Sequence, residues 1–140
     1  MALYGGNDPT NVDALQTDTY DGAGYLVKYH ADGLLKTASV TDTPIGVTID
    51  ESSRDADNAL VAVASATVSI LPLDGIIMVR SEAVAAGSVH FGMPMYVSQT
   101  SGTNGHVDDD SSNSATLVGH YYGSDGVAIV AGDLIPVAVA

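Results

Sequence analysis

Short runs of apolar or alternating residues, each bounded by turn residues, dominate this sequence after residue 24. Segments of this length that are rich in Val, Ile and Thr are typical of β-strands, and most are too short for a stable helix. The pattern predicts an all-β fold with little helix, built as a small β-barrel or a β-sandwich. The runs cover residues 25–30, 34–37, 45–49, 60–71, 76–80, 94–98, 116–122, 127–131 and 134–139.

Turn residues and alternation support this interpretation. At residues 61–70, within the run 60–71, every second residue is Ala, Val or Ile, and the residues between them change from Val to Ser and Thr along the run. This alternation is typical of a half-buried strand. Asp32-Gly33 predicts a hairpin turn between the first two runs, and Asp74-Gly75 and Asn104-Gly105 are two further turn signals. We expect helix only at residues 81–86, ending at Gly87, with a weaker candidate at 52–59.

The chain divides into an N-terminal arm and one β domain. Residues 1–23 have scattered apolar side chains and many Gly and Asp residues, which predicts an extended arm. Residues 24–140 form the domain, and a faint internal echo suggests two related β units at 24–80 and 87–140. The echo pairs Gly24 with Gly92, Gly46 with Gly119 and Val61 with Val127, and the three pairs have similar spacings along the chain.

The charge balance excludes several classes of partner. The chain of 140 residues has 17 acidic and 4 basic side chains, a net charge of -13, and 46% hydrophobic residues, too many for a disordered acidic tail. Only Lys28, Lys36, Arg54 and Arg80 could contact phosphates, so we expect no nucleic acid and no anionic membrane surface as partner. The N-terminus shows neither a signal peptide nor a membrane span.

The acidic residues are 15 Asp and 2 Glu, against a background of Ala, Val, Thr, Ser and Gly. This composition resembles that of proteins from salt-loving microbes and their viruses, because a Debye length of roughly 3 Å at about 1 M salt suppresses self-repulsion. An ordinary acidic protein kept soluble by its net charge is the alternative.

The motifs expected of an enzyme are missing. There is no Gly-x-Ser-x-Gly elbow, no glycine-rich phosphate loop and no cysteine, and both glutamates, Glu51 and Glu82, are flanked by serine. The four histidines are isolated in the sequence, without a metal-ligand spacing. The sequence therefore predicts a protein that is not an enzyme and binds no cofactor. These histidines are His30, His90, His106 and His120.

One cluster has ligand-type residues. Asp108, Asp109 and Asp110 follow His106-Val107 and form a weak candidate for a hard cation, although the alternate acids of an EF-hand are missing. The other interpretation is a solvated acidic loop between Asn104-Gly105 and the strand that starts near Thr116. We expect no active site there.

The order of segments resembles the head-decoration, or capsid cement, proteins of tailed viruses. The similarity covers about residues 24–140, and the arm and the Asp-rich insertion at 106–114 depart from it. The matching segments are VKYHADG at 27–33, PIGVT at 44–48, the alternating run 60–70, GMPMYVS at 92–98, LVG at 117–119 and DLIPVAV at 133–139.

The resemblance implies a compact β-barrel or β-sandwich without enzymatic activity, assembled as a homotrimer on the outer capsid surface of a virion. Its partner would be the major capsid protein, whose head it would stabilise. The arm, with Leu3, Tyr4, Val12 and Leu15, is our candidate for capsid binding by strand addition to a neighbouring sheet edge. The alternatives are another β-rich virion component, such as a tail, baseplate or fibre part, and a small-ligand binding module.

Overall fold

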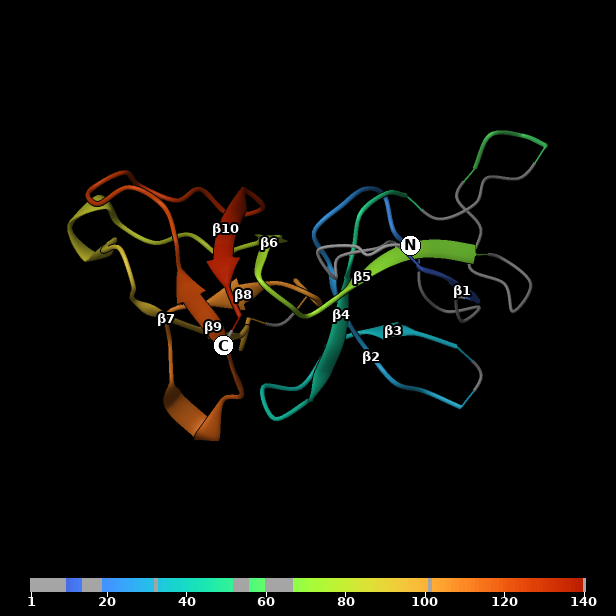
Figure 1. Cartoon of the computed structure of the whole chain (residues 1–140), viewed down its shortest axis with the longest axis horizontal. Coiled ribbons are helices and arrows are strands. Elements are labelled where there is room, and N and C mark those ends of the chain that lie inside the picture. Colours follow the sequence, from blue (N-terminus) through green and yellow to red (C-terminus); the bar gives the residue numbers. More distant parts are fainter. Residues whose placement is uncertain are drawn as a thin grey trace.

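A computed structural model describes residues 10–13, 19–31, 33–51, 56–59, 67–100 and 102–139. The chain is all-β, which confirms the predicted fold class: two five-stranded antiparallel sheets lie side by side along the long axis of the molecule (Figure 1). Within the described ranges neither sheet forms a closed barrel, and the only helical pieces are two single turns of 3₁₀ helix, η1 (Ala86–Ser88) and η2 (Ser112–Ser114).

The first sheet contains the strands of the N-terminal half, in the order β1-β5-β4-β2-β3. Its β2 and β3 form the hairpin expected from Asp32-Gly33, with Val27 opposite Lys36. The strands are β1 (Thr10–Asp13), β2 (Leu26–Lys28), β3 (Leu35–Lys36), β4 (Pro44–Thr48) and β5 (Thr67–Pro72).

The second sheet contains the strands of the C-terminal half, in the order β6-β10-β9-β7-β8. Each strand number in this order is five higher than its counterpart in the first sheet, so the two sheets have the same topology. The strands are β6 (Ile76–Arg80), β7 (Pro94–Val97), β8 (Val107–Asp108), β9 (Leu117–Tyr121) and β10 (Leu134–Ala138).

The pairing register repeats as well. Val12 lies opposite Val68 in the first sheet, and Val79 lies opposite Ile135 in the second, displaced along the chain by the same amount on both strands. In each sheet the register shifts at the same place, directly after the β2 pair Val27↔Gly46 and the β7 pair Met95↔Gly119.

The matching position of the register shift in the two sheets agrees with the echo in the sequence. Gly46 and Gly119 are themselves one of the echoed pairs, and the spacing from Val27 to Met95 equals that from Gly24 to Gly92. The sheets therefore span residues 10–72 and 76–138 and divide at 73–75, ahead of the expected boundary between 80 and 87. The third echoed pair includes Val61, which lies outside the described residues.

The two sheets share one hydrophobic core. The larger cluster of buried side chains packs on the second sheet, around Ile77, Val79 and Val137, and it includes Leu26 and Val47 from the first sheet. A smaller cluster lies beneath the first sheet, from Tyr20 to Ile70. Because side chains of both sheets are buried in the same cluster, the halves are packed against each other as one body.

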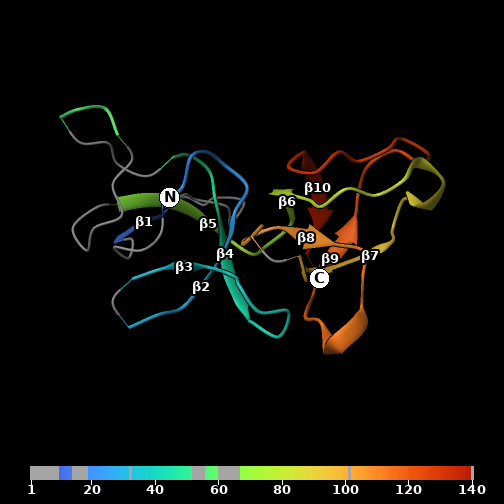
Figure 2. The same ribbon diagram turned by 180° about the vertical axis from the view of Figure 1, so that it is seen from behind.

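Backbone hydrogen bonds also cross between the sheets. The Gly24 carbonyl accepts from the Arg80 amide at 2.8 Å, and the Gly105 carbonyl accepts from the Leu26 amide at 2.8 Å. The Gly105 amide donates in turn to the Thr37 carbonyl at 2.9 Å. Figure 2 shows the opposite side of this junction, with β6 and β8 next to the first sheet. We call this junction the seam.

Three local expectations were wrong. Residues 81–84 are extended, because Ser81 and Val84 form bridges to Val107 and Ile129, and these tertiary hydrogen bonds outweigh a weak helical tendency. The run 127–131 makes only that single bridge, so it is a loop. The Asp74-Gly75 turn does not close a hairpin, since β5 and β6 belong to different sheets. Of the weaker helix candidate, residues 56–59 form a turn and 52–55 lie outside the described residues.

Candidate functional site

The arm residues proposed for capsid binding are only partly placed. Val12 lies in β1, opposite Val68 at the edge of the chain's own first sheet. Leu3, Tyr4 and Leu15 lie outside the described residues. Residues 10–13 therefore add a strand to the chain's own sheet here, rather than extending away from it.

The acidic cluster is more ordered than a solvated loop. Asp108 lies in β8 opposite Tyr96, and Val107 beside it is fully buried. The carboxylates accept hydrogen bonds from nearby backbone, Asp108 from the Asp109 amide at 2.8 Å and Asp110 from the Ser112 amide at 2.9 Å. Across the described part of the chain, no three His, Asp or Glu side chains converge as a metal site requires.

The electrostatics of this cluster are uneven. Burial, together with a hydrogen bond to the neighbouring Asp109 and charge repulsion from it, raises the pKa of Asp108 to about 6. The pKa of Asp110 is lowered, because Ser112 donates hydrogen bonds to its carboxylate. These carboxylates therefore serve mainly to shape the turn after β8.

A buried carboxylate lies at the seam, close to β8. Glu82 is only 7% exposed and follows β6 in an extended segment, where its amide donates to the Val107 carbonyl at 2.8 Å. Its Oε2 accepts hydrogen bonds from Ser98 Oγ at 2.7 Å and from Thr103 Oγ1. Hydroxyl donors thus solvate a charge that burial would otherwise make very costly.

His106 is the second titratable group of this cluster. Its Nδ1 lies 3.4 Å from Glu82 Oε2 and is buried without a hydrogen-bond partner. Loss of solvation lowers the pKa of His106, and attraction to Glu82 offsets only part of this effect. The imidazole is therefore neutral near pH 7, so hydroxyl groups rather than a cation stabilise Glu82.

Tyr25 forms the other wall of the seam. Its ring lies between two cations, with Lys36 Nζ at 4.3 Å and the Arg80 guanidinium at 4.5 Å from the ring centroid. Its hydroxyl donates to Asp21, which lowers the pKa of that carboxylate. Burial and this bond together raise the pKa of Tyr25 to about 12.

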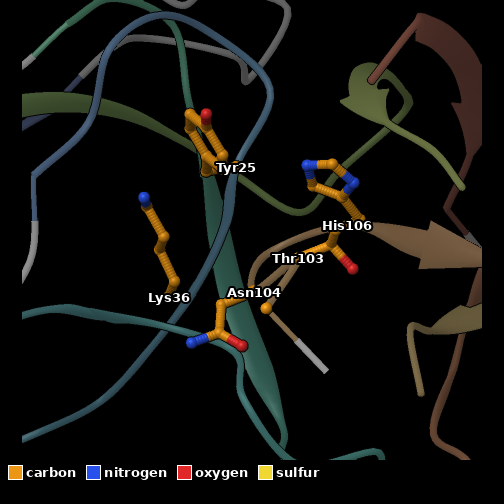
Figure 3. A pocket seen from close by; sticks show the side chains of 6 residues that line it. Tyr25, Lys36, Thr103, Asn104 and His106 are labelled. Carbon is orange, nitrogen blue, oxygen red and sulfur yellow. The ribbon is translucent and has the colours of Figure 1, made fainter. Parts of the chain in front are cut away.

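A pocket of about 260 Å³ opens between these groups. In Figure 3 the Lys36 amine points toward the Tyr25 ring from one side, and His106 lies on the other side, beside the turn that carries Asn104. Polar side chains line the pocket, and the hydroxyl of one of them, Thr103, donates a hydrogen bond to the buried carboxylate of Glu82. That hydroxyl and the imidazole both contribute to the packing of the seam. The geometry suits a structural junction better than a reaction site.

Exposed apolar side chains are unevenly distributed. Within the described first half only three large apolar residues are exposed, whereas the second half exposes eight. Acidic residues show the opposite trend, since 11 of the 17 precede Ile76. The eight are Ile76, Met78, Phe91, Leu117, Tyr122, Val127, Val130 and Leu134.

Two of these side chains, Phe91 and Tyr122, lie together on two neighbouring loops, and we call them the aromatic tip. The rings of Phe91 and Tyr122 lie 5.0 Å apart, and they are 58% and 51% exposed. The Gly126 amide donates to the Val89 carbonyl at 2.9 Å, which holds the two loops together. Both loops lie at the end of the second sheet away from the first sheet (Figures 1 and 2).

The sequence pattern pointed to neither Glu82 nor Tyr25. Glu82 and Tyr25 carry no motif, and their roles depend on contacts with residues far away along the chain, such as Thr103 and Arg80. Phe91 is the single phenylalanine of the chain and follows a histidine in a loop, a position where an aromatic residue has no strand to pack on. That placement was one signal for the tip. The other signal was the Tyr121-Tyr122 pair, the densest aromatic spot of the sequence, of which Tyr121 is buried in the core and Tyr122 is exposed.

No protein-family model matches the sequence, and comparisons with curated proteins and with solved structures found no match. None of the helical pieces in the described residues has the length and apolar character needed to cross a membrane.

Proposed function

We propose that this protein is a virion structural protein, a decoration or cement subunit that binds the outside of the major capsid protein lattice as a homotrimer. The resemblance of the strand and turn order to such proteins suggests the role. The single observation that carries it is the aromatic tip, an exposed apolar cluster on a chain with a net charge of -13.

The tip has the properties of a protein contact. Exposed aromatic pairs supply large contact area with few rotatable bonds, and such residues dominate the energy of protein interfaces. Phe91 and Tyr122 lie on loops held by hydrogen bonds, including one from the Phe91 amide to the Asp125 carboxylate. A preorganised contact of this kind loses little conformational entropy on binding.

The acidic half supports the same orientation. If the tip faces the shell, the first sheet points away from it, because the two lie at opposite ends of the molecule (Figure 1). An outward surface rich in carboxylates keeps crowded particles apart and repels nucleic acid. A tail, baseplate or fibre subunit would use a similar contact, and the copy number per particle distinguishes the two roles.

Two measurements test the proposal. Mass spectrometry of purified particles should find this chain in an amount comparable to the major capsid protein, whereas a few copies would indicate a tail or fibre role. Absence from particles would overturn the virion assignment.

The second measurement is cosedimentation with heads that lack the chain. The double variant F91S/Y122S should bind at least tenfold more weakly than the parent. The control Tyr29→Ser removes an aromatic side chain that is 74% exposed in the first half. Equal binding by the parent and F91S/Y122S would show that the tip is not the shell contact.

A further inference from the structure

We infer that the outer face of the second sheet, centred on β6 and β10, binds a second copy of this chain. This inference is argued from the geometry of the face, and it rests on the proposed function in one respect, because it assigns a surface to the homotrimer proposed above. Ile76 and Met78 are about half exposed, at 50% and 48%, while the alternating Ile77 and Val79 are buried. The face therefore has an apolar outer row as well as a buried inner one.

The outer row continues across four strands. Ile76 lies opposite Ala138, Ala138 opposite His120, and His120 opposite Pro94. Residues directly opposite each other in antiparallel strands share a face, so these side chains form one band across the sheet. Met78, opposite Pro136 in the neighbouring row, widens this band.

The internal repeat identifies the equivalent face of the first sheet, which is covered by the second sheet. In the first sheet Leu71 lies opposite Val47, and Val47 lies opposite Leu26. The repeat in the register makes these three residues the counterparts of the second-sheet row formed by Ala138, His120 and Pro94.

The first-sheet row is packed into the large core of the second sheet. The same face thus has a partner sheet in the first unit, while in the second unit Ile76, His120 and Pro94 remain exposed. The exposed row continues the geometry of an interface that the chain already forms with itself.

The charge pattern permits self-association on this face. None of the 17 acidic residues lies within β6, β7, β9 or β10, although Asp74, Glu82 and Asp133 lie within two residues of these strands and Asp108 lies in β8, opposite Tyr96 of β7. Two chains that each carry a charge of -13 repel at low salt, so the band of four strands without acidic residues is where they can meet. A cationic partner would instead be drawn to the acidic first half.

The edges of the sheets support the same conclusion. Natural edge strands avoid pairing with other chains by being short or charged. β3 and β8 have only two residues each, with Lys36 in β3 and Asp108 in β8, and β1 ends at Asp13. β6 has five residues and no charge before Arg80. It is the least protected of the four edges.

Sedimentation velocity of the full chain tests this inference. We expect the parent to sediment as more than one chain, more completely at high salt, and Met78→Lys and Ile76→Lys each to weaken association at least tenfold. Ile45→Lys is the matched control, because Ile45 is an apolar residue of β4 with a similar exposure of 44%. Far-UV circular dichroism verifies that each variant is folded.

Three outcomes would overturn the inference. The parent could sediment as a single chain at high salt, the folded Met78→Lys variant could associate like the parent, or Ile45→Lys could weaken association as much as Met78→Lys. If the parent is a single chain and Met78→Lys instead loses binding to shells, the occupant of this face is the shell protein. That result would leave binding to the shell standing, while it removes both the self-contact and the homotrimer of the proposed function.

Discussion

Gly46 and Gly119 occupy equivalent positions in the two sheets. Each lies opposite a buried residue at the register shift, Val27 for Gly46 and Met95 for Gly119. A Cβ atom would lie 2.8 Å from the Leu71 carbonyl oxygen at Gly46, and 2.3 Å from the Ala138 carbonyl oxygen at Gly119. Both glycines thus allow the backbone of the next strand, β5 or β10, to come close.

Gly46→Ala and Gly119→Ala should both destabilise the fold, by about 2 kcal/mol or more, because backbone on the neighbouring strand must move to admit the methyl group. Urea denaturation measures the loss. Gly87→Ala is the control, since a Cβ there meets nothing within 4 Å. A neutral effect at one glycine and a large effect at the other would show that the two sheets are not energetically equivalent.

Glu82→Ala should cost about 1–3 kcal/mol, because it leaves the Ser98 and Thr103 hydroxyls at the seam without their shared acceptor. Glu82→Gln should cost less, since the amide oxygen still accepts one hydrogen bond. The thermal midpoint of each variant measures the effect. Glu51→Ala removes the other glutamate of the chain, outside this cluster, and should shift the midpoint far less. Equal shifts for both glutamates would contradict a specific role of Glu82.

His106 predicts a loss of stability toward acid. Its pKa is lowered in the folded chain by burial and by the nearby cations Arg80 and Lys36, and Glu82 opposes this shift only in part. The unfolded chain then binds the proton more readily, so the contribution of His106 to stability is complete above pH 6.5 and declines as the pH falls toward the lowered pKa.

The measurement is the thermal midpoint as a function of pH. His106→Gln removes this titration, so its midpoint should decrease less than that of the parent as the pH falls below 6.5. His120→Gln, an exposed histidine of β9, is the control and should follow the parent. If His106→Gln and the parent have parallel curves, the buried imidazole does not contribute to acid sensitivity.

Local patterns predicted the strands better than their partners. The predicted run 76–80 matches β6 residue for residue, and β2 pairs with β3 as expected for a hairpin between the first two runs. The placement of Asp74-Gly75 between two sheets could not be predicted, because a turn dipeptide specifies a reversal and not which strand lies beyond it. The burial of Val107 in an acid-rich stretch could not be predicted either, because the residues around it come from distant parts of the sequence. Ser81 forms a bridge with Val107, and Leu26 belongs to the same buried cluster.

In the candidate sites too, local features could be predicted from the sequence and long-range contacts could not. Sequence reasoning identified the acid-rich composition and the Asp108–Asp110 cluster, which are local properties. It could not find the contact of Tyr25 with Arg80, which forms only when the two sheets pack together, or that of Glu82 with Thr103, which joins residues 21 positions apart within the second half. The tip likewise depends on a contact between two loops that are far apart along the chain.

Asp108→Asn should stabilise the protein at neutral pH. The pKa of Asp108 is raised to about 6 by burial and by Asp109, so above this pH the folded chain must hold an ionised carboxylate that the unfolded chain ionises near 3.8. The protonated form contributes its stability below pH 3.8, and that contribution is lost as the pH rises through about 6.

The gain for Asp108→Asn at pH 7 should be about 1 kcal/mol, allowing for the solvent that screens this partly exposed side chain, and it should disappear in acid. Denaturant unfolding at both pH values measures it. Asp110→Asn is the contrasting variant, because the pKa of Asp110 is lowered by hydrogen bonds from Ser112 and its removal should give no gain. A gain for both variants would indicate general relief of the negative charge of the chain rather than the local repulsion between Asp108 and Asp109.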